Sequence, residues 1–216
     1  MSVVIVDYGS GNLRSAQKAF IRAAGEAELS NAIVVSADPI RIARAERIVL
    51  PGVGAFADCM MGLSSTPGMV DAILDAVTHR AIPLLGVCVG MQLLATRGLE
   101  HTVTPGLDLI RGEVRRIEPR CATLKVPHMG WNTLSPERAH PVLEGIPLGD
   151  DGLHAYFVHS YAIVPERPED VLALSYHGDP FAAVVARDTV VGTQFHPEKS
   201  QALGLRLIAN FLKWQP

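Results

Sequence analysis

Short apolar runs alternate with segments of helical periodicity along the first half of the chain. The runs are rich in β-branched residues and lie at residues 3–6, 33–35, 47–50 and 83–87. Between them, apolar residues recur at helical spacing over residues 13–23 and 69–77. Continuous apolar strands that alternate with helices predict a parallel sheet covered by helices on both faces.

Strand-like segments follow one another more closely in the second half. They lie near residues 113–117, 124–134, 154–164, 171–176, 182–187 and 190–195. We expect several of them to be antiparallel or mixed additions to the same sheet, followed by a last helix from about residue 199 to 214. No linker or repeat interrupts residues 1–216. The pattern predicts one three-layer α/β domain with a mostly parallel central sheet.

The composition narrows the function classes. The 216 residues carry a formal net charge of -3, so they lack the excess of Lys and Arg that is typical of nucleic-acid binding. The apolar run at residues 2–6 is too short for a membrane span or a signal peptide. The three cysteines are far apart and show no C-x-x-C spacing, which supports neither a disulfide framework nor a zinc site. We expect a cytoplasmic protein, and the thiol chemistry considered next requires no metal or organic cofactor.

The segment Gly86-Val87-Cys88-Val89-Gly90 lies between an apolar strand and a predicted helix start. It is the cysteine counterpart of the G-x-S-x-G turn, in which small residues allow a sharp bend that exposes the nucleophile. The helix N-terminus behind it would stabilise a thiolate. The alternative for Cys88 is a buried cysteine that only packs.

A base and an orienting group for such a thiol lie near the other end of the chain. His196 comes just after the last predicted strand, and Glu198 follows across Pro197, which stiffens the turn. The alternative is an isolated surface histidine beside a helix cap. A glycine-rich turn follows a parallel strand at Gly52, Val53 and Gly54, and it could present backbone N–H groups to an oxyanion. The alternative, a phosphate-binding loop, is not supported, because no phosphate-loop motif is present there. The turn at residues 7–12 would hold Tyr8 and Ser10 near a partner or the mouth of the site.

Residues 86–92 and 195–198 resemble the nucleophile and histidine motifs of the class I (triad) glutamine amidotransferases, which have a flavodoxin-like three-layer fold. Further stretches are similar to the member of that family that works in histidine biosynthesis. They are residues 6–13, 51–54, 127–132, 156–161 and 194–200.

The resemblance implies a glutaminase whose triad is Cys88, His196 and Glu198. Glutamine would be held by Gln92, Glu100, Ser160 and Tyr161, and its oxyanion would be received near Gly52, Val53, Gly54 and Val89. The enzyme would form a heterodimer with a barrel-shaped cyclase and deliver ammonia through the interior of that partner. The residues implied at the interface are Trp131, Asn132, Tyr156 and Lys199.

Two alternatives stay open from the sequence. The glutaminase could serve another biosynthetic synthase, although residues 128–132 and 156–161 argue against this. The chain could also be a catalytically silent binding subunit, against which the intact triad argues. For Trp131 the alternative to an interface role is a place in the core, and for Lys199 it is the start of a solvated helix.

Overall fold

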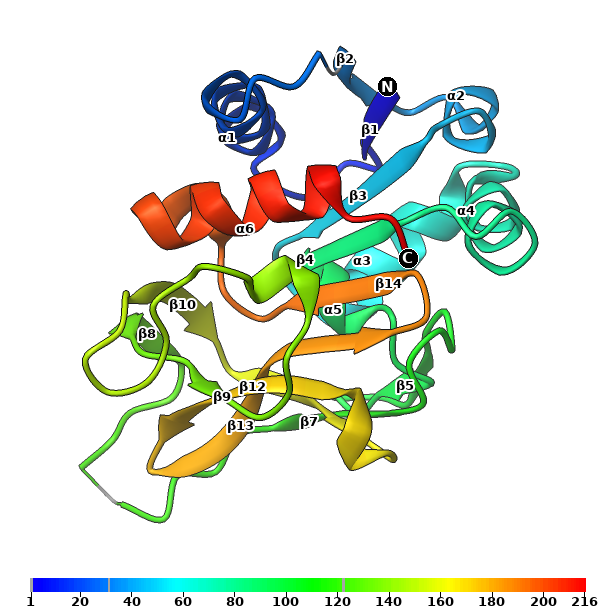
Figure 1. The fold of residues 1–216 in the computed structure, drawn as a ribbon. Coiled ribbons are helices and arrows are strands. Elements are labelled where there is room, and N and C mark those ends of the chain that lie inside the picture. The colour runs from blue at the N-terminus through cyan, green and yellow to red at the C-terminus, as the bar shows by residue number, and fades with distance from the viewer. Residues whose placement is uncertain (1, 31, 122) are drawn as a thin grey trace.

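An eight-stranded sheet runs through the molecule in the order β2-β1-β3-β4-β14-β13-β12-β9 (Figure 1). The structure is a computed structural model and describes residues 2–30, 32–121 and 123–216. The strands of this sheet are β1 (Ser2–Val6), β2 (Ala32–Ser36), β3 (Arg47–Gly52), β4 (Leu84–Cys88), β9 (Ser135–Pro136), β12 (Val171–His177), β13 (Asp179–Arg187) and β14 (Val190–Thr193). Neighbours from β2 to β14 pair in parallel, and those from β14 to β9 pair antiparallel. The predicted α/β class and mostly parallel sheet are therefore confirmed.

Helices cover both faces of the parallel part of this sheet. Helices α1 (Leu13–Glu26) and α6 (Gln201–Lys213) pack together on one face, and α3 (Phe56–Ser65) and α4 (Met69–Thr78) lie against the other, with α2 (Pro39–Ala43) beside α4 (Figure 1). Within the described ranges, no helix is long and apolar enough to cross a membrane.

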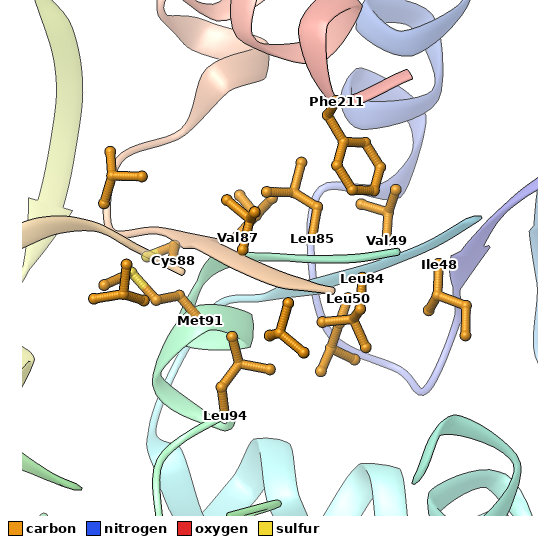
Figure 2. Close-up of a cluster of buried hydrophobic side chains, with 14 of the residues drawn as sticks. Ile48, Val49, Leu50, Leu84, Leu85, Val87, Cys88, Met91, Leu94 and Phe211 are labelled. Atoms are coloured by element: carbon orange, nitrogen blue, oxygen red, sulfur yellow. The ribbon is translucent and has the colours of Figure 1, made fainter. Parts of the chain in front are cut away.

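The central strands are buried because helices cover them from both sides. Every residue of β3 and β4 is buried, and Phe211 of α6 packs on one side of these strands while Met91 and Leu94 pack on the other (Figure 2). Burial of each such large side chain stabilises the fold by about 1.5–3 kcal/mol. Edge-to-face packing of Phe20 on Phe211, with ring centroids 6.5 Å apart, joins α1 to α6.

The second half departs from the prediction of a single extended sheet. Strands β10 (Ala155–His159) and β8 (His128–Asn132) form a separate two-stranded sheet. Strands β11 (Tyr161–Pro165), β7 (Gly112–Arg116), β5 (Arg97–Gly98) and β6 (Thr104–Pro105) form a four-stranded one. The expected strand at 154–164 thus breaks at Ser160 into two strands of different sheets. An alternating pattern predicts a strand but not its partner, which explains this error.

Helical boundaries also differ from those expected. The last helix begins at Gln201, because the short 3-10 helix η3 (Pro197–Lys199) precedes it. Two further 3-10 turns, η1 (Pro141–Leu143) and η2 (Pro168–Asp170), and the short helix α5 (Val89–Gln92) complete the elements. Helices α2 and α3 were not predicted. Helix α3 has weak helix propensity, because Gly62 and three residues with short polar side chains interrupt its pattern.

The contact between α6 and η3 yields a prediction about stability. A Cβ at Gly204 would lie 1.8 Å from the carbonyl oxygen of Pro197, whereas one at Gly25 in α1 would meet nothing within 4 Å. Gly204→Ala should therefore lower the free energy of unfolding by about 2 kcal/mol or more, because the backbone must move. Gly25→Ala should raise it by up to about 0.5 kcal/mol through helix propensity. Urea unfolding of both variants measures this, and equal changes would contradict the packing described for α6.

Candidate active site

Cys88 ends strand β4 in a strained backbone conformation. Its φ of 55° and ψ of -113° are unusual for a residue with a side chain, and α5 starts at the next residue. A Cβ at Gly90 would lie 1.8 Å from the carbonyl oxygen of Leu50, and one at Gly86 would lie 2.7 Å from that of Gly90. Only glycine fits at these two positions, so the sequence motif and the sharp turn depend on each other. The predicted strand–turn–helix around Cys88 is confirmed.

His196 lies beyond the end of the neighbouring strand β14. Thr193 pairs with Val87, so the segment after β14 leaves the same edge of the sheet as Cys88. The backbone N–H of His196 donates to the carbonyl oxygen of Tyr156, and its own carbonyl accepts from the Ser200 hydroxyl at 2.7 Å. The histidine is therefore held from both sides in the loop that leads into η3.

Glu198 orients the imidazole of His196. Its Oε1 lies 2.9 Å from Nδ1, and the two side chains are only 5% and 4% exposed. Burial alone would lower the pKa of His196, but interactions with Cys88 and Glu198 outweigh it and raise the pKa to about 9. Nε2 is buried and makes no hydrogen bond within the part of the chain that the structure describes. This leaves Nε2 available to take a proton from the neighbouring thiol.

The loop at Gly52, Val53 and Gly54 lies beside the Cys88 turn. Gly52 is in register with Cys88, and a Cβ at Gly52 would come within 2.6 Å of the Gly90 nitrogen. The N–H of Val53, however, donates to the Ser10 hydroxyl at 3.0 Å, and that hydroxyl donates to the Val53 carbonyl at 2.8 Å. One of the predicted oxyanion donors is thus engaged elsewhere. The N–H of Val89, as the first of α5, has no acceptor within its helix.

The turn after β1 holds this loop in place through hydrogen bonds from its side chains. The hydroxyl of Tyr8 donates to the Pro51 carbonyl at 2.6 Å, and Tyr8 is buried. Burial raises the pKa of Tyr8 far above its ordinary value, so the phenol stays protonated. Tyr8 and Ser10, which the sequence predicts near a partner or the mouth of the site, hold the loop that carries the predicted oxyanion donors.

A cavity of about 300 Å³ opens over the thiol. It brings together most of the residues predicted from sequence and three that were not, Pro127, Val158 and His159. The predicted residues that line it are Val53, Gly54, Cys88, Val89, Gln92, Glu100, Ser160, Tyr161 and His196. Gly52 and Glu198 do not line this cavity, but they line a second, smaller one that Val53 and His196 share with it.

The predicted substrate-binding side chains already have partners within the chain. The amide of Gln92 donates to the carbonyl of Tyr161 at 2.8 Å and to Gln194 at 3.1 Å. Glu100 accepts the N–H of Phe56 at 2.8 Å and so caps the N-terminus of α3. Sequence reasoning missed the place of Gln194 and His159 in this arrangement. Their positions inside the 194–200 and 156–161 motifs were the signals that could have pointed to them.

Three of the four predicted interface residues form an aromatic and cationic cluster beside the triad, in which Trp131 and Lys199 are exposed. Trp131 and Tyr156 are paired across β8 and β10, with ring centroids 5.5 Å apart, and Nζ of Lys199 lies 5.5 Å from the Tyr156 ring. Trp131 is 47% exposed, so the alternative that it belongs to the core is wrong. Asn132 differs from the other three, because its side-chain amide donates to the carbonyl of Tyr176 within the chain.

Comparisons with known proteins agree with this geometry. The family model described as "Glutamine amidotransferase class-I" matches residues 4–214. The chain is 61% identical to a Rhodopseudomonas palustris protein and 58% identical to one from Bradyrhizobium diazoefficiens, over the full length of both chains in each case. Both relatives are named "Imidazole glycerol phosphate synthase subunit HisH".

Solved structures agree on the fold. A crystal structure of a glutamine amidotransferase matches with a TM-score of 0.69 at 20% identity, over 97% of each chain. A glutamine amidotransferase from Thermotoga maritima matches with a TM-score of 0.62 at 16% identity, over 92% of this chain and 76% of the other. The predicted resemblance is therefore confirmed, and the chain belongs to the class-I glutamine amidotransferase family.

Proposed function

We propose that this chain is the glutaminase subunit of an imidazole glycerol phosphate synthase, which supplies ammonia to a cyclase partner in histidine biosynthesis. The observation that carries the proposal is the buried contact of His196 with Glu198 beside a cysteine on a strained turn, under a cavity lined by Gln92, Ser160 and Tyr161. Full-length relatives that bear this enzyme's name support the choice of acceptor over other synthases. Residues 1–216 would act as one domain, and a cytoplasmic location stays a prediction.

The chemistry follows from the roles of the three residues. Nε2 of His196 takes the thiol proton of Cys88, and the thiolate attacks the carboxamide carbon of glutamine. The carbon–nitrogen bond then breaks as His196 returns the proton to the leaving ammonia, which leaves a thioester on the sulfur. Water, deprotonated by His196, hydrolyses the thioester to glutamate and restores the thiol. Glu198 holds Nδ1 and stabilises the imidazolium that forms.

Dependence on the partner is part of the proposal. With the Val53 N–H bonded to Ser10, one oxyanion donor is not directed at the reacting carbonyl. A missing donor of this kind costs about a hundredfold or more in rate. We infer that docking of the cyclase changes this loop. The cluster of Trp131, Tyr156 and Lys199 lies close to the triad, because Lys199 and Glu198 both belong to η3. Ammonia would then be released only when the acceptor enzyme is bound.

Cys88→Ala tests the activity itself. Together with the cyclase, this variant should lose glutamate release by at least about a thousandfold, because no other residue lining the cavity carries a thiol. Cys121→Ser is the matched control, since Cys121 is exposed and lies outside the cavity, and it should retain full activity. Glutamate release in the presence of the cyclase is the measurement. Substantial activity in Cys88→Ala would refute the mechanism.

Trp131→Ala tests the interface. A half-exposed aromatic residue at the centre of an interface contributes about 2 kcal/mol, which corresponds to a roughly thirtyfold increase in Kd. Ile40→Ala, on α2 and with the wild-type side chain 61% exposed, should leave the Kd unchanged. Calorimetric titration with the cyclase measures both. An unchanged Kd for Trp131→Ala, or an equal loss in both variants, would remove this cluster from the interface.

A further inference from the structure

Gln194 is a buried side chain beside the nucleophile that the triad does not use. It directly follows β14 and is 0% exposed, and its backbone N–H donates to the Ala183 carbonyl at 2.9 Å. Its side-chain nitrogen lies 3.8 Å from Sγ of Cys88, within reach of a hydrogen bond to sulfur. An amide N–H that faces a thiol can stabilise the thiolate without adding a charge.

The direction of the Gln194 amide is determined by its neighbours. The Tyr161 carbonyl can only accept, so the group of Gln92 that lies 2.8 Å from it must be the NH₂. That same NH₂ lies 3.1 Å from the other end of the Gln194 amide, which must therefore be the oxygen. It follows that the NH₂ of Gln194 points to the sulfur.

A pair of buried histidines extends this chain of hydrogen bonds. Nδ1 of His159 lies 2.9 Å from the same Tyr161 carbonyl, so His159 must carry its hydrogen on Nδ1. Its Nε2 can then accept from Nδ1 of His128, at 3.2 Å. Burial lowers the pKa of His159 to about 3 and that of His128 to about 4, so both rings are neutral at physiological pH. The hydrogen bonds of these two histidines require neutral imidazoles, in which one nitrogen donates and the other can accept.

We propose that Gln194 is a further catalytic residue, which donates a hydrogen bond to the Cys88 thiolate, and that Gln92, Tyr161, His159 and His128 hold this donor in place. Gln194 keeps its protons throughout, since the thiol proton goes to Nε2 of His196. The bond strengthens when sulfur becomes charged and weakens when the thioester forms. It therefore favours the attacking thiolate and, in the second step, the departing one. This inference rests on the proposed function, because it assigns a role within the same reaction.

The pH dependence of Cys88 alkylation tests the proposal in the isolated full chain. Iodoacetamide is the probe, and peptide mass spectrometry counts Cys88 separately from Cys59 and Cys121. Gln194→Met removes the donor at similar volume, and the pH of half-maximal alkylation should rise by about one unit, the effect of one hydrogen bond to a charged group. Gln17→Met on α1, where Gln17 donates to the Ile33 carbonyl, is the matched control and should show no shift.

Gln194→Asn covers the case in which the Met variant does not fold. Its amide is one methylene shorter and cannot span from Gln92 to the sulfur, so the same rise is expected. The titratable groups around the thiol stay unchanged in the Gln194 and Gln17 variants. They are His196 with Glu198, His159 and Glu100 around the cavity, and Tyr8 and Cys59 behind the loop.

The positioning chain has its own test at His159. His159→Leu removes the donor to the Tyr161 carbonyl and should raise the alkylation midpoint, by less than Gln194→Met does. His159→Asn places an amide N–H near the position of Nδ1 and should restore the midpoint toward wild type. A purely structural role for the histidine would not give this pattern.

The outcomes are distinguishable. A folded Gln194→Met or Gln194→Asn variant with the wild-type midpoint would overturn this inference and leave the proposed function standing. A wild-type Cys88 that is not alkylated at any pH would contradict the nucleophile itself, and with it both proposals.

Discussion

The backbone at Cys88 is the constraint on which the site depends. A residue with a side chain at φ 55° and ψ -113° costs about 1–3 kcal/mol relative to a relaxed conformation. The two glycines at 86 and 90 permit it, because Gly90 allows the turn to pack directly against the backbone of β3 and Gly86 leaves room for the backbone of Gly90 and Met91. The completely buried strands β3 and β14 on either side of β4 prevent it from relaxing. This strained conformation directs the thiol away from the edge of the sheet and into the cavity.

The elements around this turn each contribute one property of the nucleophile. Strand β14 leads to His196, whose raised pKa favours the imidazolium that a thiolate needs beside it. Strand β3 leads to the Gly52–Gly54 loop, which Tyr8 and Ser10 hold in a conformation with one donor engaged. The buried network through Gln92 and Tyr161 contributes rigidity, because in each of its hydrogen bonds only one of the two groups can be the donor. The histidine that activates the thiol and the loop in which one oxyanion donor is engaged thus follow neighbouring strands of one sheet.

Much of this could be predicted from the sequence, for a physical reason. Buried parallel strands are continuous apolar runs, and a sharp turn at a nucleophile requires small residues in fixed positions, so both leave local signals. The pairing partner of a strand leaves no such signal, and neither do the polar partners of Gln92 and Glu100. Helix α3 was missed because its own residue pattern is interrupted and the group that caps its N-terminus, Glu100, lies 44 residues away. The break at Ser160 was missed because β10 and β11 pair with strands of different sheets. The exposure of Trp131 could not be derived from its residue type, since tryptophan occurs both in cores and at interfaces.

The most direct test of the account is covalent labelling with an electrophilic analogue of glutamine, such as a diazo ketone, in the presence of the cyclase. One adduct per chain is expected, on Cys88, and this adduct should be lost when excess glutamine competes for the cavity. Labelling of Cys59 or Cys121 in place of Cys88, or labelling of Cys88 that glutamine does not suppress, would contradict the claim that the strained turn presents the nucleophile to glutamine.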